Sequence, residues 1–354
     1  MNKILKIKTK EKNYIIEIGF NYLNKKLKEI VNHDKKIFFI IDKSVKYLIK
    51  DINFNSNVKI ITIDGGEKIK SFKTYSFISN KILSMGVNRS STIVAIGGGT
   101  VGDLAGFISS TVLRGLNFIL VPTTLLSQVD SSIGGKNGIN TMHGKNLIGT
   151  FYQPDKVLVD CKILKTLNKR EIKSGYAEIF KHSLINNLSF FNWLNKNYNK
   201  IINLEKKYIE IAVLKSIKIK SSYIKSDTSE KLINNKSRSM LNFGHTFGHA
   251  LETFYKYKKK ISHGEAISIG MVTASRLSYK IGQLSKKDFL KIVSHLKNVK
   301  LPTEDKNIKN KKLFSIIKLD KKNNNDKINM IFLSKIGKSY FARNLDIKKI
   351  NKIL

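Results

Sequence analysis

The first half of the chain alternates short apolar runs with an amphipathic segment. Apolar runs of strand length stand at residues 36–42, 58–64, 91–96 and 116–122. Between the second and the third run, apolar residues recur every three or four positions over residues 71–85, which is the spacing of an amphipathic helix. Strands that alternate with helices are typical of a mainly parallel sheet. We therefore predict an α/β fold for this half.

The second half has a different pattern. After one more strand-like run at residues 156–160, apolar positions follow a helical period over most of residues 170–300. A further strand-like run appears only at residues 328–333. This change of period predicts an α/β domain over residues 1–155 and an all-α domain over residues 156–354.

The composition is that of a globular protein of 354 residues, 41% of them hydrophobic. Such a content excludes a disordered chain, and no apolar run approaches the roughly 20 residues of a membrane-spanning helix. The start, MNKILKIKTK, lacks the apolar core and cleavage site of a secretory signal. The single cysteine, Cys161, excludes an internal disulfide and is typical of a reducing compartment, so we expect a cytoplasmic protein.

The charge is strongly positive, because 65 Lys and Arg against 26 Asp and Glu give a net charge of +39. A pI near 10 is frequent among nucleic-acid-binding proteins. Here only six of the basic residues are Arg, and the Lys excess is spread along the chain together with abundant Asn. We interpret it as a compositional bias on solvated faces, and we expect neither a specific nucleic acid nor a membrane as a partner.

A glycine turn follows the third strand-like run. The segment GGGTVGD contains G-x-G-x-x-G as Gly97, Gly99 and Gly102 and leads into an apolar helical segment. Strand, glycine turn and helix form the context in which backbone N–H groups and a helix N-terminus bind a pyrophosphate. A glycine turn that only packs tightly against a helix is the alternative. The polar segments 64–71 and 122–136, at other strand ends, favour the nucleotide-binding interpretation.

Three segments of the helical half contain residues that bind metals. SGYAEIFKH carries Glu178, NFGHTFGHALE carries His245 and His249 four residues apart, and SHGEA carries His263 beside Glu265. Two imidazoles and a carboxylate are a common catalytic zinc set that leaves a fourth position open. The spacing leaves open whether both His245 and His249 are ligands or one of them moves protons. The other histidines are interpreted as structural: His33, His143, His182 and His295.

These blocks, in this order, resemble the 3-dehydroquinate synthase family. The resemblance covers about residues 42–322 and also includes RGLNFILVPTTLLSQVDSSIGGKNGIN, GKNLIGTFYQP and HGEAISIGM. It implies a Rossmann-like N-terminal NAD-binding domain and a helical C-terminal metal-binding domain, with the active site in the cleft between them. It further implies a homodimer that uses NAD and Zn²⁺ or Co²⁺.

The activity that the resemblance implies is that of a phosphorus–oxygen lyase of the shikimate pathway. The substrate, 3-deoxy-D-arabino-heptulosonate 7-phosphate, is converted to 3-dehydroquinate and phosphate. The family's reaction consists of transient oxidation by NAD, elimination of phosphate, re-reduction and an intramolecular aldol closure.

Carried over motif by motif, the resemblance implies that Glu178, His245 and His263 are the metal ligands, which leaves His249 as a proton-transfer and phosphate-contact residue. The implied NAD contacts are Asp42, Glu67, Lys70, Gly98, Gly99, Asp103, Thr123, Thr124, Lys136 and Lys145. The implied substrate contacts are Asp130, Lys136, Asn146, Lys181, Lys220, Arg238, Asn242 and Lys321. Arg114 is implied to reach the substrate phosphate from the partner subunit.

Two segments depart from the family pattern. Residues 226–238, SDTSEKLINNKSR, are longer than the acidic D-E-R-E-like stretch typical of the family, and the last 30 residues match poorly. We assign the last 30 residues structure but no chemistry. Three alternatives remain: another sugar-phosphate cyclase that forms a valiolone or a deoxyinosose, a metal-dependent polyol dehydrogenase of the same fold, and a nucleic-acid-binding protein.

Overall fold

The structure is a computed structural model that describes residues 2–32, 35–255, 260–318 and 327–354. The chain divides into two compact units, Met1–Leu167 and Asn168–Leu354. Each unit has a hydrophobic core of its own. No helix within the described ranges combines the length and the apolar character that a bilayer crossing requires.

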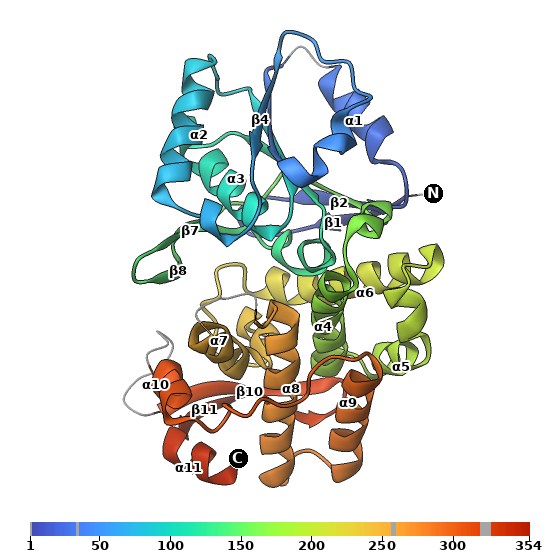
Figure 1. The fold of residues 1–354 in the computed structure, drawn as a ribbon, viewed down its shortest axis with the longest axis vertical. Helices are drawn as coiled ribbons and strands as arrows, with labels where there is room; N and C mark the ends of the chain where they lie inside the picture. The colour runs from blue at the N-terminus through green and yellow to red at the C-terminus, as the bar shows by residue number, and fades with distance from the viewer. Residues whose placement is uncertain (1, 33–34, 256–259, 319–326) are drawn as a thin grey trace. The chain divides into compact units, whose positions relative to one another are not determined.

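The first unit is built on a seven-stranded sheet with the strand order β1-β2-β9-β6-β5-β3-β4 (Figure 1). β1 is antiparallel to β2, and every other pair of neighbours is parallel. The strands are β1 (Lys3–Ile7), β2 (Tyr14–Gly19), β3 (Ile37–Asp42), β4 (Val58–Ile63), β5 (Thr92–Gly97), β6 (Asn117–Pro122) and β9 (Lys156–Asp160).

The central strands are buried on both faces, which explains their unbroken apolar runs. In β3, the residues from Phe38 to Ile41 are all 0% exposed. The elements that connect the strands are the helices α1 (Leu23–Val31), α2 (Phe72–Ser84) and α3 (Gly99–Thr111), the short turns η1 (Lys43–Ile49), η2 (Glu67–Ile69), η3 (Val112–Arg114), η4 (Ser127–Ser131) and η5 (Cys161–Thr166), and the hairpin of β7 (Lys136–Thr141) and β8 (Gly144–Phe151).

The sheet contains a point at which the direction of winding reverses. β3 and β5 are neighbours; β4 lies on the far side of β3, and β6 lies on the far side of β5. The loops that leave the carboxyl ends of β3 and β5 therefore diverge and leave a crevice, which is where open α/β sheets bind ligands.

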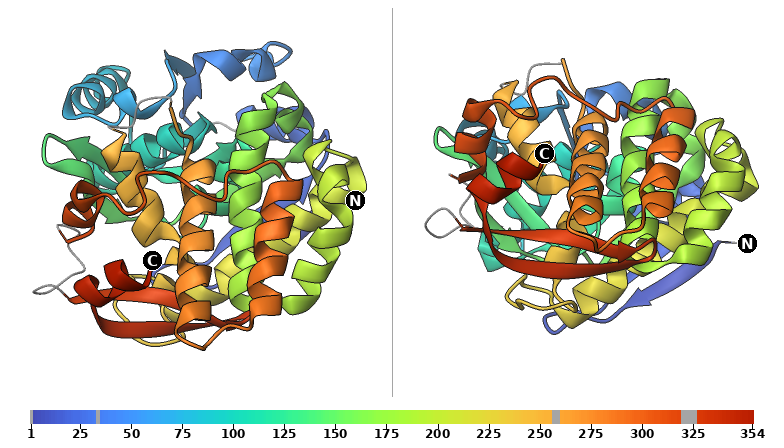
Figure 2. Two further views of the ribbon diagram at one scale, coloured as in Figure 1. Left: turned by 60° about the horizontal axis from the view of Figure 1, so that its bottom comes forward. Right: turned by 90° about the horizontal axis from the view of Figure 1, so that it is seen from below.

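The second unit is helical, as predicted, with one addition, a β-hairpin near its C-terminus (Figure 1). Its elements are α4 (Lys169–Asn186), α5 (Leu188–Ile202), α6 (Lys206–Ser226), η6 (Arg238–Asn242), α7 (His245–Phe254), α8 (His263–Lys280), α9 (Lys286–Asn298), α10 (Lys311–Lys318), β10 (Lys327–Lys335), β11 (Lys338–Asp346) and α11 (Ile347–Ile353). The hairpin β10–β11 packs against α8 and α4 (Figure 2). The strand-like run at residues 328–333 lies within β10.

The strands and helix singled out by periodicity are present, but other elements of the first unit escaped that analysis. β1 lies at the edge of the sheet and the hairpin β7–β8 lies outside it, and these strands carry Lys, Asn or Gly among their apolar residues. β2 lies between β1 and β9 and is interrupted only by Glu17. The sequence boundary at residue 155 also cuts off β9. That strand pairs with β2 and β6, so it belongs to the first unit, which ends at Leu167.

Candidate functional site

In the first unit, the residues expected to contact NAD gather at one edge of the sheet. Because β3, β4, β5 and β6 are parallel, their carboxyl ends meet there. Asp42 ends β3, and Gly97 at the end of β5 is level with Pro122 at the end of β6. The other members lie in the loops, turn and first helical turns that follow β4, β5 and β6: Glu67, Lys70, Gly98, Gly99, Asp103, Thr123 and Thr124.

The N-terminus of α3 fits a pyrophosphate group. Gly98 is the N-cap residue, and no side chain caps the first turn of the helix there, so its N–H groups keep the capacity to hold an anion. The neighbouring side chains approach so closely that a larger residue would have to displace them. A Cβ at Gly99 would lie 2.7 Å from the Ser131 hydroxyl, and one at Gly98 would lie 3.3 Å from Thr124. The same loop thus also packs tightly, which was the alternative interpretation of these glycines.

Lys70 is the centre of a polar network beside this helix. Its ammonium is buried, lies 2.6 Å from the Asp103 carboxylate and also bonds to the Asn146 side chain. Burial raises the pKa of Asp103, and the positive charge of Lys70 opposes that rise. Lys70 therefore ties the loop after β4 to both α3 and the hairpin β7–β8.

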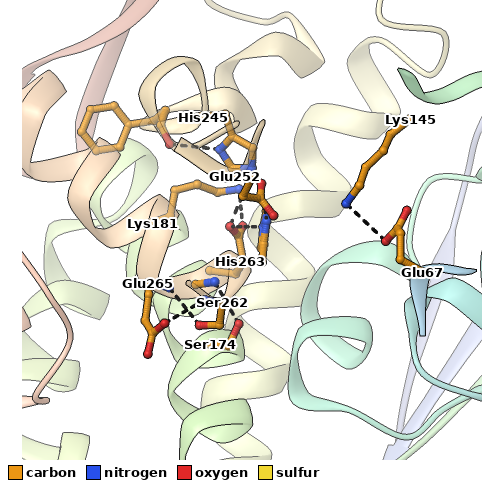
Figure 3. A network of polar contacts seen from close by, with 12 residues as sticks. Glu67, Lys145, Ser174, Lys181, His245, Glu252, Ser262, His263 and Glu265 are labelled. Carbon is orange, nitrogen blue, oxygen red and sulfur yellow. Dashed lines mark hydrogen bonds and ion pairs between the residues drawn. The ribbon is translucent and has the colours of Figure 1, made fainter. Parts of the chain in front are cut away.

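The hairpin makes a second connection through Glu67. The Glu67 carboxylate accepts a hydrogen bond from the Asn140 side chain at 2.8 Å and faces the Lys145 ammonium at 3.4 Å (Figure 3). Asn146 has a positive φ of 54°, and its N–H donates to the Asn140 side chain at 3.0 Å. The structure thus brings Lys145 and Asn146 together with the loop after β4, although more than 70 residues separate them in sequence.

Three further predicted residues of the first unit lie in turns. Asp130 is part of the π-helical turn η4, and Lys136 begins β7 with an exposed side chain. Arg114 is exposed and has a φ of 65° directly after Leu113 with a φ of 50°. Two consecutive non-glycine residues in the left-handed region are energetically costly, and such strain is typical of functional turns.

In the second unit, Glu178 of α4 lies at the centre of a buried charged cluster. Its carboxylate is 0% exposed, forms an ion pair with Lys181 one turn along and faces the Nε2 atoms of His245 at 3.7 Å and His263 at 3.5 Å. Figure 3 shows Lys181, His245 and His263 close together. Burial alone would raise the pKa of Glu178, but Lys181 and the two imidazoles hold it well below its usual range. Neither buried oxygen has a hydrogen bond of good geometry within the described residues.

The two imidazole rings are oriented by their other nitrogens. His245 Nδ1 lies 3.3 Å from the Phe243 carbonyl oxygen, and His263 Nδ1 lies 3.3 Å from the Glu252 carboxylate. Metal-binding histidines use one ring nitrogen in this way, which directs the other toward the ion. Both Nε2 atoms therefore converge on Glu178, and the three ligand atoms lie within 4.8 Å of one another. One carboxylate and two imidazoles fit Zn²⁺ or Co²⁺.

The protonation of these rings differs. Burial lowers the pKa of His245 well below its ordinary value, and Lys181 contributes, so this imidazole is neutral and ready to ligate. Burial would also lower the pKa of His263, but the nearby carboxylates of Glu178 and Glu252 outweigh it and raise the pKa to about 10. A cation bound at Nε2 would replace that proton.

Glycine contacts between helices bring the ligands together. A Cβ at Gly270 of α8 would lie 2.0 Å from the Gly244 carbonyl oxygen, and a Cβ at Gly248 of α7 would lie 2.7 Å from Ile267. At the start of α8, a Cβ at Gly264 would lie 2.3 Å from Ser174 of α4. The glycines beside the histidines thus allow α4, α7 and α8 to approach closely enough to share one cluster.

His249 and Glu265 lie outside the buried cluster. His249 is exposed, and its ring centroid lies 4.9 Å from that of His245. With Glu252 and His263 it forms a second, more exposed group of ligand atoms. Glu265 closes the capping box with Ser262 and forms a bidentate pair with Arg170 at 2.6 and 2.8 Å, so its role is structural.

The predicted cationic residues of this unit are buried. Lys181 is 1% exposed, Lys220 on α6 is 5% exposed and Arg238 in η6 is 4% exposed. η6 packs against α6 and against α4. Asn242, the last residue of η6, donates to Glu230 at 3.0 Å. Three buried cationic side chains favour the binding of an anionic ligand. The predicted Lys321 and its neighbour Lys322 lie outside the described residues.

Two of the histidines interpreted as structural have well-defined buried partners. His295 Nε2 forms a hydrogen bond with the Tyr176 hydroxyl at 2.9 Å. The His295 ring stacks on that of Phe180 at a centroid distance of 4.3 Å. His182 Nδ1 lies 2.6 Å from the Ser216 hydroxyl. His143 is in an exposed turn, and His33 lies outside the described residues.

Sequence reasoning missed Glu252 and Ser174. Glu252 follows His245 by seven residues, two helical turns, so the helical period could have placed both on one face. Ser174 accepts the Gly264 N–H at 2.9 Å and holds the start of α8 against α4. It has no local sequence signal, because its partner lies 90 residues away.

Two family models match adjacent parts of the chain. The model described as 3-dehydroquinate synthase N-terminal matches residues 60–174, and the model described as 3-dehydroquinate synthase C-terminal matches residues 175–323. Together they cover more than half of the chain.

Curated relatives are similar over nearly the whole chain. A 3-dehydroquinate synthase from Pelagibacter ubique (strain HTCC1062) is 44% identical over 361 residues, which span 99% of this chain and 97% of the relative. One from Dictyoglomus thermophilum (strain ATCC 35947 / DSM 3960 / H-6-12) is 41% identical over 350 residues, 99% of this chain and 97% of the relative.

Solved structures share the fold. A 2-deoxy-scyllo-inosose synthase complexed with carbaglucose-6-phosphate, NAD⁺ and Co²⁺ matches with a TM-score of 0.82 at 24% identity, over 99% of this chain and 100% of that one. A 2-epi-5-epi-valiolone synthase from Streptomyces hygroscopicus subsp. jinggangensis 5008, with NAD⁺ and Zn²⁺ bound, matches with a TM-score of 0.82 at 21% identity, over 98% and 97%. From the two family models and the full-length relatives, we conclude that this chain belongs to the 3-dehydroquinate synthase family.

Proposed function

We propose that this protein converts 3-deoxy-D-arabino-heptulosonate 7-phosphate to 3-dehydroquinate and phosphate, with NAD and Zn²⁺ or Co²⁺ as cofactors. The observation that carries the proposal is the convergence of His245 and His263 Nε2 on the buried Glu178 carboxylate. It occurs in a chain that is 44% identical to a 3-dehydroquinate synthase.

The first unit supplies the NAD site in this proposal. The uncapped N-terminus of α3 at Gly98 and Gly99 holds the pyrophosphate. Asp42, at the reversal of winding, accepts hydrogen bonds from a ribose. The remaining proposed contacts are Glu67, Lys70, Asp103, Thr123, Thr124, Lys136 and Lys145.

The second unit supplies the metal ligands Glu178, His245 and His263. When bound, the cation polarises a substrate hydroxyl, and NAD takes up and returns one hydride. Lys181, Lys220 and Arg238 are buried cations that neutralise the substrate's carboxylate and phosphate where water screens least. Asn242, Asn146 and Lys321 are the further proposed substrate contacts.

Proton transfer is assigned to two side chains. His249 is exposed beside the proposed metal ligands, so its imidazole is accessible to substrate. Asp130 lies in the turn η4, which follows β6 and the threonines proposed to contact NAD.

We further propose a homodimer in which Arg114 serves the partner subunit's site. The strained turn exposes Arg114 next to Leu113, which is 37% exposed. β8 carries Leu147, Ile148 and Phe151 at 36%, 36% and 42% exposure. Exposed apolar residues in one strand favour a protein interface. The single buried Cys161 supports a reducing compartment such as the cytoplasm.

The first experiment measures phosphate release from the heptulosonate phosphate together with NADH absorbance. The proposal requires phosphate release without net NADH, lost on chelation and restored by Zn²⁺ or Co²⁺. NADH accumulation without phosphate release would instead indicate a polyol dehydrogenase. If neither is formed, the valiolone- and deoxyinosose-forming substrates of the related cyclases are the next to assay.

A second experiment tests the shared site. Arg114→Ala should weaken substrate binding while NAD still binds, and Ile148→Lys should yield monomers in analytical ultracentrifugation. A dimer with normal substrate affinity in both variants would contradict the proposed interface.

A further inference from the structure

Two parts of the chain have no role in the function proposed above: the segment 227–237 and the hairpin β10–β11. We propose that they form a frame that positions Arg238 and Asn242, with Asp227 as its central positioning residue. The inference rests on the proposed function, in which Arg238 and Asn242 contact the substrate.

Asp227 holds both ends of the segment. Asp227 is 6% exposed and directly follows α6. The carboxylate accepts the backbone N–H of Lys231 at 2.8 Å, of Leu232 at 3.2 Å and of Arg238 at 3.1 Å, and the Ser237 hydroxyl at 3.2 Å. A buried carboxylate with four donors is strongly restrained, because bonds to a charged acceptor are stronger than neutral ones.

The two proposed substrate contacts bond to the same segment. The Arg238 guanidinium donates to the Thr228 carbonyl at 2.9 Å, and the Asn242 amide donates to the Glu230 carboxylate at 3.0 Å. Thr228 directly follows Asp227, and Glu230 comes three residues after Asp227. The geometry of Asp227 therefore determines both the backbone position of Arg238 and the orientation of its side chain.

The hairpin holds the outer side of the segment. The Phe341 N–H donates to the Asn235 side chain at 2.9 Å, and the Arg343 guanidinium donates to the Ile233 carbonyl. η6 also packs against both β10 and β11. Both views of Figure 2 show the yellow segment beside the red hairpin. The C-terminal residues, to which the sequence analysis gave no chemistry, thus contact the segment that carries Arg238.

The frame should act on substrate binding. A mobile arginine loses side-chain freedom when it binds an anion, and a prearranged one has lost it already. An interaction made equally in the ground state and the transition state changes KM and leaves kcat unchanged. Loss of the frame is therefore expected to raise KM for the sugar phosphate with little change in kcat.

Asp227→Asn tests the central residue. The NH₂ group of the new Asn side chain would face backbone N–H donors and could not accept their hydrogen bonds. Hydrogen exchange of the backbone N–H groups of Lys231 and Arg238 should therefore become fast. KM should rise about tenfold, the change that one charged hydrogen bond of about 1.4 kcal/mol provides, with zinc content unchanged. Asp305→Asn is the matched control outside the frame, because the Asp305 carboxylate also accepts a backbone N–H, that of Asn307 at 2.8 Å, and a hydroxyl, that of Tyr255 at 2.8 Å. Ser237→Ala removes one of the four hydrogen bonds to Asp227, and it replaces Asp227→Asn as the test if that variant fails to fold.

Asn235→Ala tests the hairpin contact. Its matched control is Asn329→Ala, because the Asn329 side chain also accepts an N–H of β11, that of Asn344 at 3.1 Å, but within the hairpin. We expect a higher KM in Asn235→Ala alone. Equal KM values in both variants would overturn the hairpin's part in the frame.

The outcomes separate the two proposals. Fast amide exchange in Asp227→Asn with an unchanged KM would refute the positioning role and leave the proposed function intact. If the wild-type protein releases no phosphate, the proposed function fails. The frame is then judged by whether Asp227→Asn, but not Asp305→Asn, makes the Arg238 backbone amide exchange fast.

Discussion

The orientation of two imidazole rings determines what the second unit can bind. His263 is directed by Glu252, which no motif singled out, and His245 by a backbone carbonyl. Groups that hydrogen-bond to the second ring nitrogen of a metal-binding histidine change metal affinity by about 10- to 100-fold. We therefore predict that Glu252→Gln lowers the zinc affinity by that factor, measured by competition with a chromophoric chelator.

Glu304→Gln is the control, because Glu304 pairs with Arg276 at 2.8 Å and is exposed. The prediction fails if the two variants bind zinc equally well.

Removal of a proposed metal ligand should have a larger effect than removal of a group that orients one. His263→Ala removes one of three ligand atoms from a residue at the start of α8, whose capping box of Ser262 and Glu265 remains. We expect no bound zinc after dialysis and an unchanged far-UV circular dichroism spectrum. Full zinc content in this variant would exclude His263 as a ligand.

Among the helices, the contact between α7 and α8 depends on glycine. A Cβ at Gly270 would meet the backbone oxygen of Gly244, which cannot move without shifting α7. Gly270→Ala should destabilise the protein by about 1–3 kcal/mol and lower its zinc affinity. In Gly102→Ala the new Cβ would meet a Leu120 methyl group at 3.2 Å, which can rotate away. Chemical denaturation should rank Gly270→Ala as the less stable variant; the reverse order would contradict the packing argument.

The aromatic core of the second unit makes stability depend on pH. Burial lowers the pKa of His295 to about 3 from an ordinary value of 6.5. Between these values the unfolded chain binds a proton that the folded protein does not, so this residue makes stability fall as the pH drops from 6.5 toward 3. His295→Gln should reduce that slope by up to about 1.4 kcal/mol per pH unit. Exposed His143→Gln should leave it unchanged; equal slopes in both variants would refute this origin.

Across the whole molecule, the net charge of +39 opposes folding through mutual repulsion. The described ion pairs are few beside 65 basic residues. Added sodium chloride screens repulsion between exposed charges. The free energy of unfolding should therefore increase from low to moderate ionic strength, measured by urea denaturation. A decrease would mean that the attractive pairs dominate.

The sequence by itself determined the elements whose signal is local. β3, β5 and β6 are buried on both faces, so their apolar runs are continuous, and α2 shows a plain helical period. The glycine turn and the three histidines of the second half were also evident, because glycine and imidazole have few structural substitutes in such positions.

Only the tertiary structure decided which residues act together. It directs His245 and His263, but not His249, at Glu178. Which histidines face Glu178 depends on the carbonyl and the carboxylate that orient the rings of His245 and His263. It assigns β9 to the first unit through pairing with β2 and β6. It also brings the hydrogen-bond donors of the following segment to the Asp227 carboxylate. A hydrogen bond depends on distance in space, so it produces no periodic pattern in the sequence.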